Sequence, residues 1–168
     1  MTSIVLTPAD DLAPRVQPTL ARLSAQLNSL LPDVSLHHIG STAIPGALTK
    51  GDVDVLFRVS PECFQAIVTV LSRHFTIKQA SNWTSEFASF GDDSAYELPV
   101  GIQVVVEGSN LDFFLFLRDH FILNPEALRQ YNLLKIAHAD KGEHGYWKAK
   151  DEFLARILAS RRNDTPHH

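Results

Sequence analysis

Apolar residues recur at intervals of three and four along the N-terminal part of the chain. They place one apolar stripe along a helix: Leu12, Val16, Leu20, Leu23, Leu27 and Leu30. Pro14 and Pro18 interrupt this pattern, because proline fits the first turn of a helix but removes a hydrogen bond from its interior. The sequence therefore predicts a helix whose regular part begins near Pro18, or kinks there, and ends at about Leu31.

The middle of the chain combines short β-like runs with one helical stretch. Residues 34–40 and 52–59 are expected to be strands, and Pro45, Gly46 and Gly51 leave the segment between them too broken for a long helix. A helix is expected from Pro61 to Phe75, which would pack Cys63. Three more β-like runs follow, at residues 75–79, 86–90 and 101–107.

The last third of the chain changes to a helical pattern. Helices are expected at residues 111–123, from Asn124-Pro125 onward, and at residues 146–160, with a break at residues 141–145. The polar tail, residues 161–168, is expected to be loose, and Trp83 and Trp147 are expected to pack in the interior.

Length and composition limit the classes of protein. With 168 residues, 45% hydrophobic and 20% charged, the chain is expected to form one globular domain. Its net charge of −4 disfavours non-specific binding to nucleic acid or to anionic membranes. The longest uncharged apolar run, residues 113–117, is far short of the roughly 20 residues that span a bilayer, and the expected location is the cytoplasm.

One stretch of the sequence carries a pattern that is typical of a metal- and phosphate-binding site. Gly40-Ser41 is followed, after ten residues, by Asp52-Val53-Asp54 on an expected strand. Alternate strand residues share a face, so the two carboxylates would lie about 7 Å apart and could share Mg²⁺. The Gly-Ser turn would offer backbone N–H groups to phosphates, which favours phosphoryl or nucleotidyl transfer. The alternative is a solvated strand face or a turn, which is what most Asp-x-Asp pairs form.

These residues resemble the signature of the nucleotidyltransferase superfamily of the DNA polymerase beta type. Within it, the chain is most similar to the GrpB family, a resemblance that covers nearly the whole chain. The matching residues are His38-Ile-Gly-Ser-Thr-Ala-Ile-Pro-Gly46, Lys50, Val53-Asp54-Val55, Phe116-Leu-Arg118-Asp119, Asn124-Pro125, Tyr131, Lys135, Tyr146 and Lys150. The resemblance implies an α/β (α+β) fold, with a small mixed sheet flanked by helices over residues 1–107 and a C-terminal helical section over residues 108–160.

The resemblance also implies an activity and a set of site residues. The expected activity is Mg²⁺- or Mn²⁺-dependent transfer of a nucleoside monophosphate from a nucleoside triphosphate to a small-molecule or protein acceptor. Asp52 and Asp54 would hold metal, and Ser41 would join them in the catalytic set. Arg118, Lys135 and Lys150 would form a basic lid above an acidic floor. The triphosphate would be bound by a larger group of residues: His38, Gly40, Ser41, Thr42, Lys50, Arg118, Tyr131, Lys135 and Lys150.

Two departures from the family pattern bear on activity. The family places its second acid two residues after the first, at the position of Leu56, whereas here the pair is Asp52 and Asp54. The third acid is expected on the strand at residues 101–107, where Gln103 takes the central inward position and Glu107 is the remaining candidate metal ligand. Glutamine is a poor general base. A second reading therefore stays open: a non-catalytic module that binds a nucleotide, a phosphorylated metabolite or a protein partner.

Overall fold

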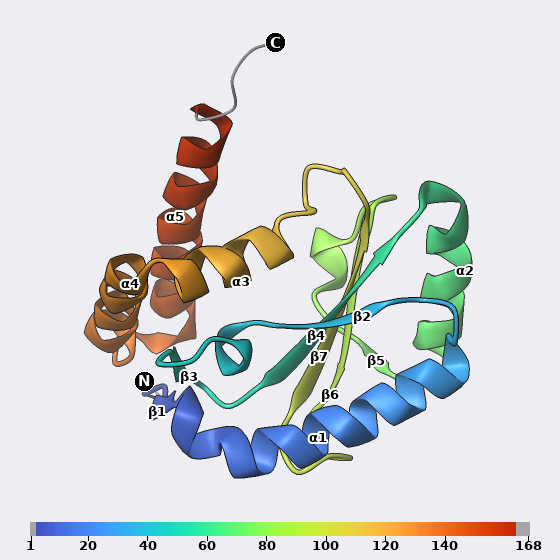
Figure 1. Ribbon diagram of the computed structural model, residues 1–168, viewed down its shortest axis with the longest axis horizontal. Coiled ribbons are helices and arrows are strands. Elements are labelled where there is room, and N and C mark those ends of the chain that lie inside the picture. The colour runs from blue at the N-terminus through green and yellow to red at the C-terminus, as the bar shows by residue number, and fades with distance from the viewer. Residues whose placement is uncertain (1–2, 164–168) are drawn as a thin grey trace.

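The computed structural model describes residues 3–163, and a five-stranded mixed sheet lies at its centre (Figure 1). The strand order is β2 (Leu36–Ile39), β4 (Val53–Val59), β7 (Val100–Val106), β6 (Phe87–Asp92) and β5 (Thr76–Ile77). Strands β4 and β7 run parallel, and the other neighbouring pairs run antiparallel. A separate two-stranded ladder joins β1 (Thr7–Pro8) to β3 (Leu48–Thr49).

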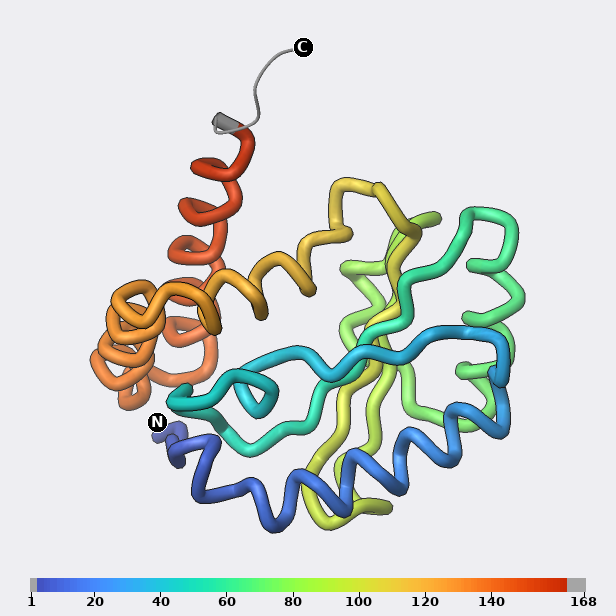
Figure 2. Tube along the Cα trace, in the orientation of Figure 1, coloured from blue at the N-terminus to red at the C-terminus, as the bar shows by residue number. Residues whose placement is uncertain are grey.

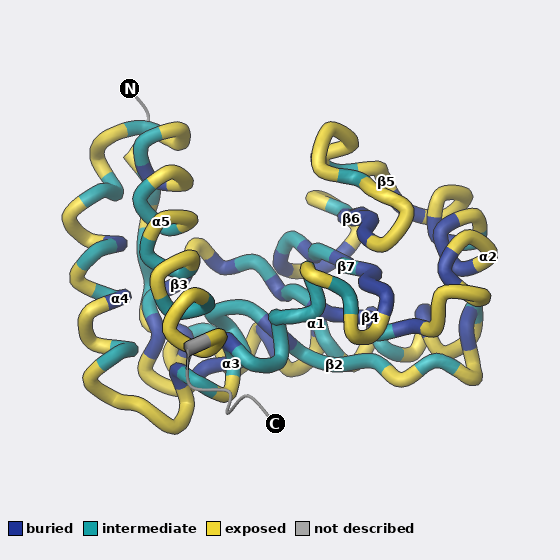
Figure 3. The backbone as a smooth tube through the Cα atoms, turned by 90° about the horizontal axis from the view of Figure 1, so that it is seen from above, coloured by how far each residue is buried: buried dark blue, intermediate teal, exposed yellow. Residues whose placement is uncertain are grey.

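Two helices cover one face of the sheet. Helix α1 (Ala9–Leu30) and helix α2 (Pro61–Ser72) bury their apolar stripes against the odd-numbered residues of β4 and the even-numbered residues of β7, among them Val55 and Ile102. These strand side chains are almost completely excluded from solvent. Figure 3 shows the buried residues concentrated along β4 and β7. The larger hydrophobic cluster therefore lies on this face, whereas the opposite face combines a smaller apolar cluster, which includes Leu56 and Val105, with polar side chains.

Three C-terminal helices stand beside the sheet and partly cover its opposite face. They are α3 (Phe114–Leu123), α4 (Pro125–His138) and α5 (Gly142–Asn163). The stacked rings of Phe121, Tyr131 and Phe153 hold them together. The N-terminal segment joins this group, because the Ile4 N–H donates to the Ala139 carbonyl oxygen. The segment before β1 that contains Ile4 thus lies beside the turn between α4 and α5, as the trace of the chain shows (Figure 2).

The expected α/β class with a mixed sheet and a C-terminal helical section is confirmed, and several local predictions need correction. Helix α1 begins at Ala9, with Pro14 and Pro18 inside it. Both prolines are exposed, so water can hydrate the carbonyl groups that lose their helical partners. Cys63 is likewise exposed on α2. Helix α5 starts at Gly142, earlier than the predicted 146, and continues to Asn163, whereas residues 164–168 of the predicted loose tail lie outside the described residues.

Two short 3₁₀ helices follow strands of the sheet. The first, η1 (Ser41–Ala43), follows β2 directly, and the second, η2 (Ala80–Asn82), follows β5. Within residues 3–163, none of the helices has the length and apolar character needed to cross a membrane.

The position of Pro18 inside α1 leads to a stability prediction. Pro18→Ala should stabilise the protein by roughly 1–2 kcal/mol, because an alanine in a helix interior is about 3 kcal/mol more favourable than proline, and part of this gain is lost to the more flexible unfolded chain. Differential scanning calorimetry should show a higher melting temperature. Pro8→Ala, which changes a proline before α1, is the control and should leave stability nearly unchanged. A lower melting temperature for Pro18→Ala would contradict the continuous helix.

Candidate functional site

A cleft of about 890 Å³ lies between the free face of the sheet and the C-terminal helices. Its floor includes Asp54 on β4 and Gln103 on β7, which lie on neighbouring strands two register positions apart. Lys135 of α4 and Lys150 of α5 line the opposite side. The cleft thus brings together most of the residues that the sequence singled out.

Asp54 is held between two glycines. It pairs in register with Gly101 on β7 and, on the other side, with Ile39, which directly precedes Gly40. A Cβ on Gly40 would lie 2.8 Å from the Asp54 Oδ2 atom, and one on Gly101 would overlap Oδ1. Gly40 also has a φ of 75°, a region that favours glycine. The carboxylate can occupy this position because both neighbours lack side chains.

The enclosure of Asp54 changes its acidity. The pKa of this carboxyl is raised to about 6, first by burial and then by the nearby charge of Asp52, while Lys150 and Lys50 act in the opposite direction. The site thus places two carboxylates close enough to repel each other. A cation between them would relieve that repulsion.

Asp52 differs from the sequence prediction in its local structure. It precedes β4, which begins at Val53, and its carboxylate is partly exposed beside Lys50, whose Nζ lies 3.7 Å from Oδ2. Thr42 supports this position, because its hydroxyl donates to the Asp52 carbonyl oxygen at 3.1 Å. The acid pair is therefore formed by one strand residue and one loop residue.

The cations of the cleft meet around a tryptophan that was expected to pack in the interior. Trp147 is 37% exposed. Lys50 Nζ and Lys150 Nζ lie 4.5 and 4.3 Å from the centroids of its rings, so both ammonium groups contact the same aromatic side chain. The charge of Lys50 also contributes to a lowered pKa of Lys150, about 8, whose largest cause is burial. Sequence periodicity cannot separate such a residue from a core tryptophan.

Lys135 is the most enclosed cation of the site. It is only 1% exposed, and its Nζ donates to the Ser41 hydroxyl at 2.7 Å and to the Leu48 carbonyl oxygen at 2.6 Å. The ring of Tyr131 lies 4.2 Å from the same nitrogen. Burial, followed by the charge of Lys150, lowers the pKa of Lys135 to about 7. The Tyr-Lys pairs at one-turn spacing are therefore contacts within the site.

His38, Thr42 and Arg118 act beside the cleft floor. Because Thr42 gives its hydroxyl proton to Asp52, its oxygen accepts a hydrogen bond from His38 Nε2 at 3.0 Å. Arg118 donates to the His38 carbonyl oxygen at 3.1 Å and pairs with Asp119 at 2.9 Å. His38 thus has a partner within the protein, and its expected role in binding the triphosphate stays a prediction.

The expected third acid is not at the site. Glu107 lies beyond the end of β7, six residues after the partner of Asp54, a separation of roughly 20 Å along the strand. It pairs instead with Arg58, at 3.5 Å. Gln103 is the β7 residue beside Asp54, and its Oε1 atom is buried without a hydrogen-bond partner among the described residues. Residues 3–163 contain no group of three acidic, histidine or cysteine side chains placed to hold a metal.

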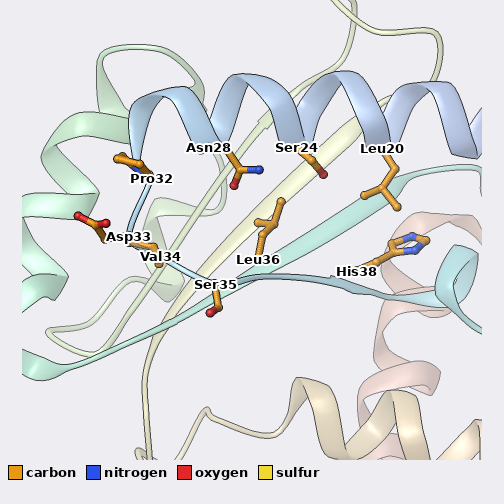
Figure 4. Close-up of a pocket in the computed structure, with 9 residues that line it drawn as sticks. All are labelled: Leu20, Ser24, Asn28, Pro32, Asp33, Val34, Ser35, Leu36 and His38. Atoms are coloured by element: carbon orange, nitrogen blue, oxygen red, sulfur yellow. The ribbon is translucent and has the colours of Figure 1, made fainter.

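A second groove, of about 590 Å³, runs between α1 and β2 (Figure 4). Ser24 and Asn28 line it from the helix, and Ser35 and His38 from the strand side. Its lining combines uncharged polar and apolar side chains with Asp33 and His38, and it lacks the facing acids and lysines of the cleft. The cleft is therefore the stronger candidate for a site that handles a charged ligand.

Comparisons with known proteins identify the family of this chain. The GrpB protein family matches residues 4–160. The chain belongs to the GrpB family. A UPF0157 protein of Vibrio cholerae is 33% identical over 151 residues, which cover 89% of this chain and 79% of that protein. A UPF0157 protein of Pseudomonas aeruginosa is 28% identical over 82% of this chain and 59% of its own length.

Solved structures extend the GrpB assignment to the fold. Conserved protein GrpB from Enterococcus faecalis is similar with a TM-score of 0.62 and 19% identity, covering 92% of this chain and 99% of that one. The Cid1 poly(U) polymerase in its MgGTP-bound form is similar with a TM-score of 0.51 and 16% identity, covering 77% of this chain and 43% of that one. This GrpB-family chain therefore has a nucleotidyltransferase-like fold.

The raised pKa of Asp54 predicts how stability depends on pH. Because the folded-state pKa of about 6 exceeds the unfolded value, the native state loses stability as pH rises from about 4 to above 6. Asp54→Asn should therefore be more stable than wild type at pH 8, by about 1–2 kcal/mol, and nearly equal to it at pH 4. Chemical denaturation at several pH values measures this difference. Asp93→Asn, which changes an exposed acid of the same cleft, is the control, and an equal effect there would contradict the role of burial.

Proposed function

We propose that this protein binds the magnesium complex of a nucleoside triphosphate in the cleft and transfers its nucleoside monophosphate to a hydroxyl or phosphate acceptor. The observation that carries this proposal is the arrangement of Asp52 and Asp54 opposite Lys135 and Lys150, with Lys50 beside them. Carboxylates suit Mg²⁺, and the lysines suit phosphate oxygens. The nucleotidyltransferase-like fold agrees with such chemistry without establishing it for this chain.

The residues at the floor fit a magnesium ion. Mg²⁺ is commonly held by one or two carboxylates together with substrate phosphates, and Asp52 and Asp54 provide the carboxylates. Gln103 on the neighbouring strand offers an amide group nearby, whose Oε1 atom has no hydrogen-bond partner among the described residues. When bound, the ion would neutralise charge on the phosphates and activate the phosphorus centre toward attack.

The chain's own residues divide the remaining work between them. Lys50, Lys135 and Lys150 would balance the charge that develops on the departing pyrophosphate. The Gly40-Ser41 turn would approach the phosphates closely, since Gly40 carries no side chain. The apolar part of the lining, which includes Phe113, Phe114 and Leu117, offers a surface for the base or the acceptor and keeps water from the reacting atoms.

The binding part of this proposal can be tested by calorimetry. Titration with ATP, GTP, CTP or UTP in the presence of Mg²⁺ should give heat with at least one nucleotide. Asp54→Asn should weaken that binding at least tenfold, because the variant loses a metal-binding charge. Asp93→Asn should bind as wild type does. Absence of heat with all four nucleotides would overturn the proposal.

Gln103 supports a second candidate function, in which the protein binds a nucleotide but does not transfer its nucleoside monophosphate. The residue occupies the place where a third acid is expected, and its side chain cannot accept a proton from an attacking hydroxyl at neutral pH. Wild-type protein that binds the magnesium–nucleotide complex but releases no pyrophosphate with any acceptor favours this second function. Release of pyrophosphate favours transfer.

Variants of Gln103 and Glu107, the two candidates for the position of the third acid, test how the metal is held. Gln103→Glu should add a charged ligand next to Asp54 and increase the affinity for Mg²⁺ about tenfold, which would appear as a larger rise of melting temperature in a Mg²⁺ titration. Glu107→Gln is the matched variant and should respond as wild type does, since Glu107 pairs with Arg58 away from the cleft. A loss of the Mg²⁺ response in Glu107→Gln would restore the role that the sequence assigned to it.

A further inference from the structure

The side of the cleft that faces the lysines carries polar side chains without charge. They are Ser89 on β6 and Gln79 and Asn82 at η2, and together they are called the polar rim. Gln103 of β7 lies at the foot of this rim, because it pairs in register with Ser89. Figure 3 shows α4 and α5 on one side of the molecule and β5 and β6 on the other. The polar rim and the lysines thus belong to opposite sides of one cleft.

Hydrogen bonds anchor the segment that carries the rim. The Lys78 carbonyl oxygen accepts from the Ser89 hydroxyl at 2.8 Å and from Trp83 Nε1 at 3.0 Å. The Trp83 ring also packs edge-on against Phe90, with 5.1 Å between the centroids. Residues 78–83 are therefore fixed against β6 at both ends, which gives their side chains defined positions.

Gln79 holds a costly backbone conformation at this place. Its φ is 44°, and no other residue except glycine has a positive φ within residues 3–163. Glycine adopts such a conformation freely, whereas a Cβ makes it unfavourable. Strain of this kind is concentrated at functional sites. A glutamine in place of a glycine here, with its side chain lining the cleft, indicates a use for the amide.

The chemistry of the rim suits hydroxyl groups. Amides and hydroxyls each donate and accept hydrogen bonds, so they complement one another. Gln103 Oε1 has no partner among the described residues, and rotation of the terminal amide exchanges it with Nε2. Lys78 and Asp93, the charged residues beside the rim, pair with each other at 2.7 Å. The rim therefore offers hydrogen bonds to a ligand but no unpaired charge.

The rim also lies where an acceptor must enter. The proposed function places the pyrophosphate beside Lys135 and Lys150, and the α-phosphorus near Asp54. In such a transfer the attacking and departing oxygens lie on opposite sides of the phosphorus, so the attacking oxygen comes from the side of the rim. Two strand spacings and two residues along the strand separate Asp54 from Ser89, roughly 12 Å in total. That distance leaves room for one ring.

We propose that the polar rim is the acceptor subsite and that the acceptor is an uncharged ring with several hydroxyl groups, a sugar or a cyclitol. This inference rests on the proposed function. An acceptor hydroxyl oxygen bonds to the α-phosphorus, and its proton passes to water. The bond from that phosphorus to the pyrophosphate oxygen breaks, and its electron pair leaves with pyrophosphate.

Size and lining agree with such an acceptor. A cleft of about 890 Å³ lies in the range of small-molecule sites, which favours a small acceptor over a protein side chain. Phe87 shares the face of Ser89 on β6 and lines the cleft, so an aromatic ring is available to the apolar face of a sugar. The apolar lining at α3 then remains for the base of the nucleotide.

The test is saturation-transfer NMR on the protein with Mg²⁺, alone and with the α,β-methylene analogue of the nucleotide that binds in calorimetry. The probes are D-glucose, D-ribose and myo-inositol, and glucose 6-phosphate and gluconate are their anionic counterparts. At least one neutral probe should receive magnetisation, and the anionic counterparts should bind about tenfold more weakly, because the rim has no unpaired cation. Absence of a signal from all three neutral probes, or tighter binding of an anionic counterpart, would overturn the proposal.

Variants of the rim separate binding from folding. Gln79→Gly removes the amide and relieves the backbone, so it should melt near the wild-type temperature and bind the probe about tenfold more weakly. Ser81→Ala is the matched control, since Ser81 is an exposed residue of η2 outside the cleft lining, and it should bind as wild type does. If Gln79→Gly melts early, Asn82→Ala decides in its place. Wild-type affinity in the deciding variant contradicts the subsite.

Nucleotide calorimetry distinguishes failure of this inference from failure of the proposed function. Gln79→Gly should bind the magnesium–nucleotide complex as wild type does, and weaker binding would place the base on the rim and overturn the inference. Wild-type protein that binds nucleotide but no probe also overturns it and leaves the proposed function standing. If no nucleotide binds, the probes are titrated into the protein alone: binding that Gln79→Gly weakens supports the subsite, and absence of binding overturns it.

Discussion

The hydrogen bonds of Lys135 join the two walls of the cleft. The lysine comes from α4, and its partners, Ser41 and the Leu48 carbonyl, come from the segment that links β2 to β4. Burying an ammonium group is costly unless its hydrogen bonds are made, so the position of α4 relative to this segment is fixed by the need to satisfy Nζ. The stacked rings of Phe121, Tyr131 and Phe153 then carry the same constraint to α3 and α5.

The acidic residues at the floor of the cleft and the lysines on its opposite side depend on each other for their charge balance. Enclosure raises the pKa of Asp54 toward neutrality, while burial lowers the pKa values of Lys135 and Lys150 toward it. Each shift reduces the charge that the protein must hold in a poorly solvated cleft. A ligand that carries both a cation and phosphates would supply the missing partner to each side, so its binding is expected to return acids and lysines to their charged forms. This coupling makes the cleft responsive to one class of ligand.

The sequence predicted which helices and strands form better than it predicted where each of them begins and ends. Periodicity found the strands and helices because one face of each is apolar, and it placed the Tyr131-Lys135 and Tyr146-Lys150 pairs because residues four apart share a helix face. It could not extend α1 back to Ala9, since the tolerance of Pro14 and Pro18 depends on their exposure to water. It missed Trp147, because a tryptophan beside apolar residues looks the same whether it packs or lines a cleft.

The acid positions show why spacing alone cannot define a site. Asp52 and Asp54 share parity, but the strand begins at Val53, so one acid is carried by a strand and the other by a loop that Thr42 supports. Glu107 shares parity with Gln103, yet distance along β7 takes it to Arg58. Gly101 makes room for the Asp54 carboxylate, and the sequence contained a sign of this. A glycine inside a strand often marks a place where another group approaches the backbone closely, and here that group is the Asp54 carboxylate. Alternation along a strand determines which face of the sheet a side chain occupies. Only the register between neighbouring strands determines which residues on that face lie close enough to act together.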